Sequence, residues 1–196
     1  MTEYEKKVLL TKEEYESFLE FFGYDKSFEQ INYYFDTDDL SMNMQDITCR
    51  IRFKDGRYKG TIKKHISNKE QSEETEINIQ NGIYENEFID SGLKLQGLLV
   101  TKRHIIWEVF GCEVVLDKNE YLGYTDYELE IEYLSECEKQ AKFIFELFLM
   151  ILVRHKFTAV QAYKVPSKSS RFFEKKLKEI KLKKSFNSNR DNSCQD

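Results

Sequence analysis

Identically charged side chains at every second residue are the feature of this sequence that most restricts its fold. Glu128, Glu130 and Glu132 alternate with apolar residues, and Arg50 and Arg52 flank an isoleucine. A β-strand points successive side chains to opposite faces, so each charged series lies on one face of a strand. The pattern therefore predicts a protein built largely from strands that each carry one charged face and one apolar face.

The same spacing recurs along most of the chain, with acidic and basic series in different segments. Like charges two residues apart repel, so each series lowers stability unless opposite charge or a metal ion lies nearby. The remaining members of the pattern are Glu3, Glu5 and Lys7; Lys59, Thr61 and Lys63; and Glu74 and Glu76.

Two interpretations of the charged faces are open. The ordinary one places apolar side chains in the core and charged side chains in water. The alternative places acidic and basic strands around a concave, water-filled interior, where their charges offset one another and attract metal and phosphate. Because the series are strings of identical charge, we favour the second. We expect an α+β fold, a closed antiparallel β-barrel of about eight strands with a charged lumen and helices packed outside.

Length and composition narrow the class of protein. At 196 residues the chain predicts one domain, over residues 1–184, followed by a disordered tail over 185–196. A formal net charge of −5 gives no overall attraction to nucleic acid or to a membrane surface. The N-terminus is charged, no apolar run is long enough for a membrane span, and the four cysteines have no metal-type spacing. These features predict a cytoplasmic protein with free thiols.

Helix and turn signals separate the charged series. A capping box at Thr11–Glu14 predicts a helix that ends at Gly23, and a similar motif at Ser135–Glu138 predicts a second helix. A short helix is expected over 84–91 and a terminal one from about Ser170. Strands are expected at 48–53, 57–64, 74–79, 99–107, 112–118 and 127–133, with a hairpin turn at Asp55-Gly56, a loop over 119–123 and a flexible connection over 65–72.

The motifs, in this order and on these strand faces, resemble the CYTH domain of the triphosphate tunnel metalloenzyme superfamily, in particular its small stand-alone members from Gram-positive bacteria. The resemblance extends from Glu3 to Phe172. The motifs that carry it are Glu3-x-Glu5-x-Lys7, Tyr34-Phe35-Asp36-Thr37, Arg50-Ile51-Arg52, Thr61-Ile62-Lys63, Glu74-x-Glu76, Thr101-Lys102-Arg103, Asp117, Tyr127-Glu128-Leu129-Glu130-Ile131-Glu132 and Lys168-Ser169-Ser170-Arg171-Phe172.

The resemblance implies an eight-stranded tunnel that binds a triphosphate together with Mg²⁺ or Mn²⁺. It also implies the role of each charged residue, and Thr101 stands where many members carry a lysine. The implied metal ligands are Glu3, Glu5, Glu130, Glu132 and Asp117, with Glu74, Glu76 and Glu128 as secondary candidates; the implied substrate-binding residues are Lys7, Arg50, Arg52, Lys63, Arg103, Lys168 and Arg171; and the implied catalytic residues are Glu3, Glu5, Lys7, Glu130 and Glu132.

The function expected from this resemblance is metal-dependent hydrolysis of a small-molecule triphosphate. Inorganic tripolyphosphate is the first substrate expected, followed by thiamine triphosphate and nucleoside triphosphates. Two alternatives stay open: a class IV type of adenylate cyclase that makes cyclic AMP from ATP, and a sensor that binds polyphosphate without turnover. We expect no membrane or nucleic-acid partner. Whether the chain forms a homodimer is open.

Overall fold

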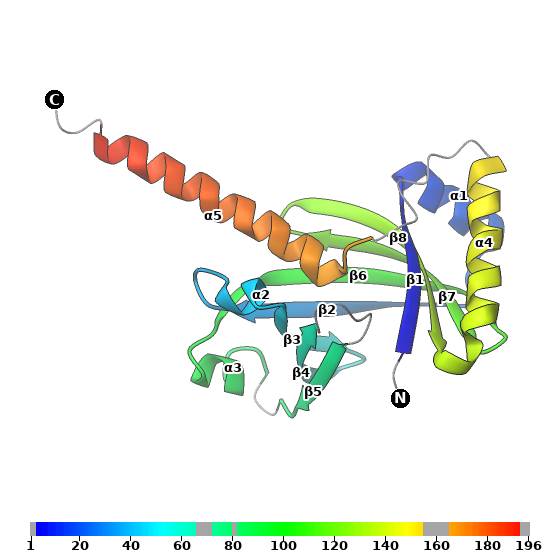
Figure 1. Ribbon diagram of the computed structural model, residues 1–196, viewed down its shortest axis with the longest axis horizontal. Coiled ribbons are helices and arrows are strands. Elements are labelled where there is room, and N and C mark those ends of the chain that lie inside the picture. The colour runs from blue at the N-terminus through cyan, green and yellow to red at the C-terminus, as the bar shows by residue number, and fades with distance from the viewer. Residues whose placement is uncertain (1–2, 66–71, 80–81, 155–164, 193–196) are drawn as a thin grey trace. The chain divides into compact units, whose positions relative to one another are not determined.

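The computed structural model describes residues 3–65, 72–79, 82–154 and 165–192 (Figure 1). It combines eight strands of one sheet with helices, in agreement with the expected α+β class, and closure of the sheet into a barrel stays a prediction. In chain order the elements are β1 (Glu3–Leu10), α1 (Lys12–Phe22), β2 (Lys26–Asp36), α2 (Ser41–Met44), β3 (Ile47–Lys54), β4 (Arg57–His65), β5 (Ser72–Ile77), α3 (Glu87–Asp90), β6 (Lys94–Val109), β7 (Cys112–Tyr121), β8 (Tyr124–Leu134), a 3₁₀ turn (Ser135–Cys137), α4 (Glu138–Arg154) and α5 (Lys168–Asn192).

The chain forms two compact units, each made from two separate stretches of sequence. The first unit comprises Met1–Gln30 and Val100–Val165, and the second comprises Ile31–Leu99 and Pro166–Asp196. Strands β2 and β6 contribute residues to both units. The strand order is β1-β8-β7-β6-β2 within the first unit and β6-β2-β3-β4-β5 within the second. The sequence predicts one domain over residues 1–184, and the division into two compact units leaves this a prediction.

In the first unit the apolar strand faces pack against helices α1 and α4 (Figure 1). Leu116, Leu129 and Ile131 on β7 and β8 are fully buried, as is Phe148 on α4. Thr11 caps α1 by accepting a hydrogen bond from the backbone of Glu14, whose side chain accepts one in return, so the predicted capping box is confirmed. The helices thus cover the face of these strands opposite to the one with the acidic series.

Tight two-residue turns set the register of the hairpins. Asp55 and Gly56 both have positive φ, 50° and 74°, which confirms the predicted hairpin between β3 and β4. Leu122 and Gly123 do the same between β7 and β8, with φ of 46° and 76°. The expected loop over 119–123 was too long, because residues 119–121 continue β7 in register with β8.

Other boundaries differ from the expectation. The motif at Ser135 forms no capping box: a 3₁₀ turn lies there, its cap residue makes no side-chain hydrogen bond, and α4 begins at Glu138. The short helix covers only Glu87–Asp90, since Asn86 caps it. Helix α5 begins at Lys168 and extends to Asn192, through the first part of the expected tail. Most of the expected flexible connection over 65–72, at residues 66–71, lies outside the described residues, and no described helix is long and apolar enough to cross a membrane.

Candidate functional site

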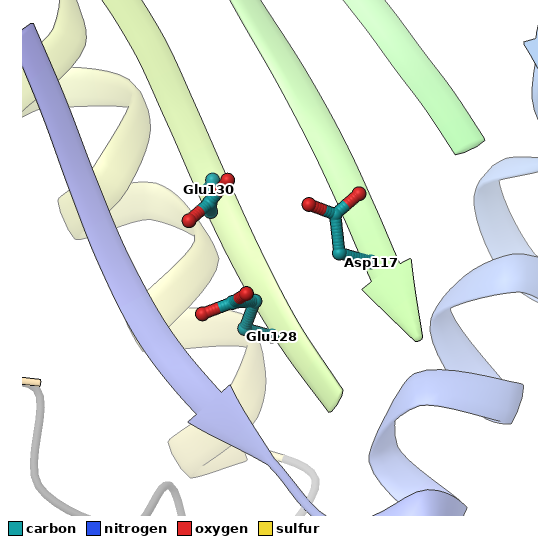
Figure 2. Close-up of side chains that lie close together, drawn as sticks. All are labelled: Asp117, Glu128 and Glu130. Atoms are coloured by element: carbon teal, nitrogen blue, oxygen red, sulfur yellow. The ribbon is translucent and has the colours of Figure 1, made fainter. Parts of the chain in front are cut away.

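Three carboxylates of β7 and β8 lie together in the first unit (Figure 2). Asp117 is paired in register with Glu128, and Glu130 follows on the same face of β8. One carboxylate oxygen from each lies within 4.8 Å of the others. All three side chains are buried, with relative exposures of 0%, 0% and 1% for Asp117, Glu128 and Glu130. Glu128 and Glu130 of the acidic series of β8 therefore do not lie on a solvated outer face. A concave, water-filled interior bounded by acidic and basic strands stays a prediction.

Arg103 of β6 provides the positive charge closest to this acidic face. Its Nε and Nη2 donate hydrogen bonds of 2.9 and 2.7 Å to the two oxygens of Asp117. Nη2 also donates to Glu130 at 2.8 Å, and Nη1 donates to Glu132 at 2.5 Å. Burial alone would lower the pKa of Arg103, but Asp117, Glu132 and Glu130 outweigh it and raise that pKa. Arg103 is thus a permanently charged member of the acidic cluster.

Strand β1 adds a second cation beside the cluster. Lys7 is paired in register with Glu130, and its Nζ lies 3.9 Å from a Glu130 carboxylate oxygen. The same ammonium donates a hydrogen bond of 2.5 Å to Glu5. Glu3 begins β1 opposite Leu134, and its side chain lies outside the described part of the structure. Among the described side chains, Glu5 and Glu132 are not members of the three-carboxylate group.

A neutral hydrogen-bond chain, which the sequence analysis missed, positions Glu128. Thr101 donates to the Oδ1 of Asn119 at 2.7 Å, and the Nδ2 of Asn119 donates to Glu128 at 2.8 Å and to Asp126 at 3.0 Å. Thr101, Asn119 and Glu128 are fully buried. The spacing of Asn119 two residues after Asp117 on one strand face was the signal that could have revealed it.

The outer face of β6 carries a histidine. His104 is buried next to Arg103 in sequence but packs against the rings of Tyr15 and Tyr24, at centroid distances of 6.3 and 4.4 Å. Burial, followed by the charge of Lys102, lowers the pKa of His104, and the charge of Asp117 opposes this shift. His104 therefore belongs to the helix-covered side and is not part of the charged cluster.

In the second unit four cations influence the buried side chain of Tyr34. Burial raises the pKa of Tyr34, and the charges of Arg50, Arg52, Lys168 and Arg171 oppose that shift. The Tyr34 ring packs against Phe172 and Phe173 of α5, with centroids 4.7 and 5.5 Å away. This packing brings the first turn of α5 to strand β2. The four bases come from two elements of the second unit, β3 and α5. The sequence predicted these bases as one phosphate-binding set, but it could not reveal the packing of Tyr34 on α5.

The bases of the second unit contact both neutral and acidic groups. Arg52 donates from Nε to the Oδ1 of Asn32 at 3.0 Å, and Arg171 donates to the backbone oxygen of Pro166 at 2.8 Å. The Nη2 of Arg50 lies 3.6 Å from Glu74, while its buried Nε has no hydrogen-bond partner among the described residues. Guanidinium groups with N–H donors held in this way suit an anion with several oxygens.

The secondary candidates of β4 and β5 are arranged differently. Glu74 and Glu76 are in register with Lys63 and Thr61, and Lys59 pairs with Glu76. The side chains of Lys59 and Glu76 are 55% and 68% exposed, so this pair lies in water. Glu74 and Glu76 thus lie in the second unit with five of the predicted bases, Arg50, Arg52, Lys63, Lys168 and Arg171. The first unit contains Lys7 and Arg103 together with Asp117, Glu128, Glu130 and Glu132.

The donor set of the first unit suits a divalent cation. Three buried carboxylates with oxygens this close repel one another, and carboxylate oxygens are the ligands that Mg²⁺ and Mn²⁺ prefer. Glu128 belongs to this set, although the sequence analysis gave it only a secondary place.

Comparison with known proteins identifies the family. The family model of the CYTH domain matches residues 1–163, so the chain belongs to the CYTH domain family. "Putative triphosphatase YjbK" of Bacillus subtilis (strain 168) is 31% identical over 200 residues, which cover 91% of this chain and 97% of that protein.

Solved structures share the fold. A protein from Bacillus halodurans described as "a putative adenylate cyclase" is 26% identical, with a TM-score of 0.65 over 88% of this chain and 100% of that chain. HpAC1 from Hippeastrum, described as a "putative adenylyl cyclase" with a dominant triphosphatase activity, is 20% identical, with a TM-score of 0.66 over 88% of this chain and 96% of that one. The second similarity is one of fold alone.

Proposed function

We propose that this protein is a metal-dependent triphosphatase that hydrolyses inorganic tripolyphosphate or a related small triphosphate. The observation that carries the proposal is the cluster of three buried carboxylates, Asp117, Glu128 and Glu130. Membership of the CYTH family and the likeness to a protein named as a triphosphatase point to the same activity. The fold alone would not separate a hydrolase from a cyclase.

The metal site is the first part of the proposal. Asp117, Glu128 and Glu130 would hold the ion, with Glu3, Glu5 and Glu132 as further acidic residues of the first unit. A bound Mg²⁺ or Mn²⁺ would supply charge neutralisation at phosphate oxygens and a more acidic bound water. Asn119 fixes the orientation of Glu128 through its hydrogen bond, so the chain itself sets the geometry of one proposed ligand.

Phosphate binding is the second part. The N–H groups of Arg50, Arg52 and Arg171 and the ammonium of Lys168 would bind phosphate oxygens, with Lys7, Lys63 and Arg103 as the other proposed bases. A phosphoryl group in transfer spreads negative charge over its oxygens, and fixed cations stabilise that charge.

The substrate class follows from charge and from the lack of a base-recognition feature in the sequence. Basic side chains and a divalent cation are sufficient to bind a linear triphosphate. A cyclase must also bind adenine and activate a ribose hydroxyl. Tripolyphosphate is therefore the proposed first substrate, and the enzyme is proposed to act in the cytoplasm.

The test is phosphate release by the purified full chain from tripolyphosphate, thiamine triphosphate and ATP, with Mg²⁺, with Mn²⁺ and with a chelator. The proposal expects metal-dependent release, with tripolyphosphate hydrolysed fastest. Cyclic AMP and pyrophosphate from ATP would instead identify a cyclase. Thermal stabilisation by tripolyphosphate without any turnover would identify a sensor.

A further inference from the structure

Arg103 binds two of the three carboxylates that a metal ion would need. Both oxygens of Asp117 accept hydrogen bonds from its guanidinium, as does one oxygen of Glu130. Asp117 and Glu130 are two of the three residues whose oxygens lie close enough for shared coordination. A divalent cation and Arg103 therefore use the same carboxylates.

The charges around Arg103 leave room for one divalent ion. Five carboxylates lie with two cations, Arg103 and Lys7; the carboxylates are those of Glu5, Asp117, Glu128, Glu130 and Glu132. When all are ionised their net charge is −3, from five negative and two positive groups. Without Arg103 the net charge would be −4 around a largely buried site, where an uncompensated charge is costly.

The hydrogen bonds of Arg103 differ in how readily they can be exchanged. Its contact with Asp117 is bidentate and fully buried, while its Nη1 contact reaches Glu132, a partly exposed side chain. Two nitrogen atoms of Arg103 bind Asp117, whereas Glu130 and Glu132 each receive one hydrogen bond. The guanidinium can therefore keep its two bonds to Asp117 while it releases Glu130 and Glu132, and this leaves N–H donors that point away from Asp117.

We propose that Arg103 is an internal counter-ion of the acidic cluster, which a divalent cation displaces from Glu130 and Glu132, so that its guanidinium binds an anion only after the metal is in place. This inference rests on the proposed function for the identity of the anion, a triphosphate. It adds an order to the reaction: the metal binds first and creates part of the phosphate site. Metal and phosphate then bind with positive coupling beyond their own attraction.

A static role for Arg103 makes the opposite prediction about metal affinity. If Arg103 only held Asp117 in a binding orientation, its loss would weaken metal binding. If Arg103 competes with the metal, its loss strengthens metal binding in the absence of phosphate. The two roles are therefore separated by the sign of one measured change.

The first test is calorimetric titration of the metal-free full chain with Mn²⁺, without phosphate. We expect Arg103→Gln to bind Mn²⁺ at least about fivefold more tightly than the wild type, and Arg103→Lys to lie between them. Lys102→Gln is the matched control, since it removes the same charge from an exposed neighbour on β6 and should leave the affinity unchanged. Equal or weaker binding by both Arg103 variants would overturn the proposal.

Wild-type protein supplies a second test that needs no folded variant. In a sample with ¹⁵N-labelled arginine, Mg²⁺ should shift the Nε–H resonance of Arg103 and broaden or shift its Nη resonances. An unchanged Arg103 spectrum at saturating Mg²⁺ would overturn the proposal. Circular dichroism of each variant checks that the fold is retained.

A third measurement separates this inference from the proposed function. The factor by which Mn²⁺ tightens tripolyphosphate binding should be smaller in Arg103→Gln than in Lys102→Gln. If the metal displaces Arg103 but the protein does not hydrolyse tripolyphosphate, the proposed triphosphatase activity is wrong and the proposed counter-ion role of Arg103 is retained. Normal hydrolysis with an undisplaced Arg103 would contradict the counter-ion alone.

Discussion

Strands β7 and β8 of the first unit and strands β4 and β5 of the second carry the same every-second-residue charges in very different surroundings. Asp117, Glu128 and Glu130 are buried with Arg103, whereas the ion pair of Lys59 and Glu76 lies in water. Charge at every second residue therefore predicts which strand face a side chain occupies, but it does not predict whether that face is exposed to solvent. The contribution of each charge to stability differs accordingly. Loss of a partner destabilises the protein strongly when the remaining charge is buried and only slightly when it is exposed.

The largest expected effect is on stability when the buried counter-charge is removed. Arg103→Met leaves buried carboxylates without their main cation and should lower the free energy of unfolding by about 3–5 kcal/mol in metal-free buffer. Lys59→Met, at the exposed pair, should cost less than about 1 kcal/mol. Urea denaturation measures both. Similar values for the two variants would remove the distinction between the regions.

The next effect is on turnover. Glu130→Gln keeps the volume of a buried proposed ligand but removes its charge, so metal-dependent phosphate release should fall by at least about 100-fold. Glu76→Gln makes the same change in the exposed pair and should stay within about twofold of the wild type. Initial rates at saturating Mg²⁺ measure this, and an active Glu130→Gln would exclude Glu130 as a ligand.

A smaller effect sharpens the comparison within the second unit. Arg52→Ala removes one of the proposed phosphate-binding bases and should raise the KM for tripolyphosphate by about tenfold or more, since hydrogen bonds to charged groups contribute about 1.5–3 kcal/mol. Lys59→Ala, on the neighbouring strand, should change KM little. Equal effects would show that the exposed lysine belongs to the phosphate-binding set.

The smallest expected effect is on the pH dependence of stability, at His104 on the face of β6 opposite to Arg103. Burial lowers the pKa of His104 in the folded state, so the unfolded state binds the proton more readily. Stability should therefore fall as pH drops through the unfolded-state pKa of about 6.5. His104→Gln should reduce the difference in urea midpoint between about pH 7.5 and about pH 5.5. An unchanged difference would show that His104 does not contribute to this pH dependence.

The sequence predicted strand faces well because parity depends on local geometry alone. It placed Glu128, Glu130 and Asp117 on charged faces, and it located the Asp55-Gly56 hairpin from turn chemistry. It could not predict which acids meet, because that depends on the register fixed by the tight turn at Leu122 and Gly123. With the register known, Asp117 lies opposite Glu128.

Other features depend on contacts that one chain segment cannot reveal. The role of Asn119 requires Thr101 of a different strand, and the place of Tyr34 requires the packing of α5 on β2. The motif at Ser135 looked like a helix cap, yet Ser135 donates to the side chain of Glu136 instead. Tertiary pairing decided each of these cases.

The interleaving of the two units along the chain has a consequence for biosynthesis. Strand β1 pairs with β8, with Glu3 opposite Leu134, so β1 has its partner only after strands β2 to β7 have been synthesised. Pairings so distant in sequence are slow to form, and unpaired strand edges exposed in the meantime favour aggregation. The nascent chain should therefore depend on chaperones until β8 has left the ribosome.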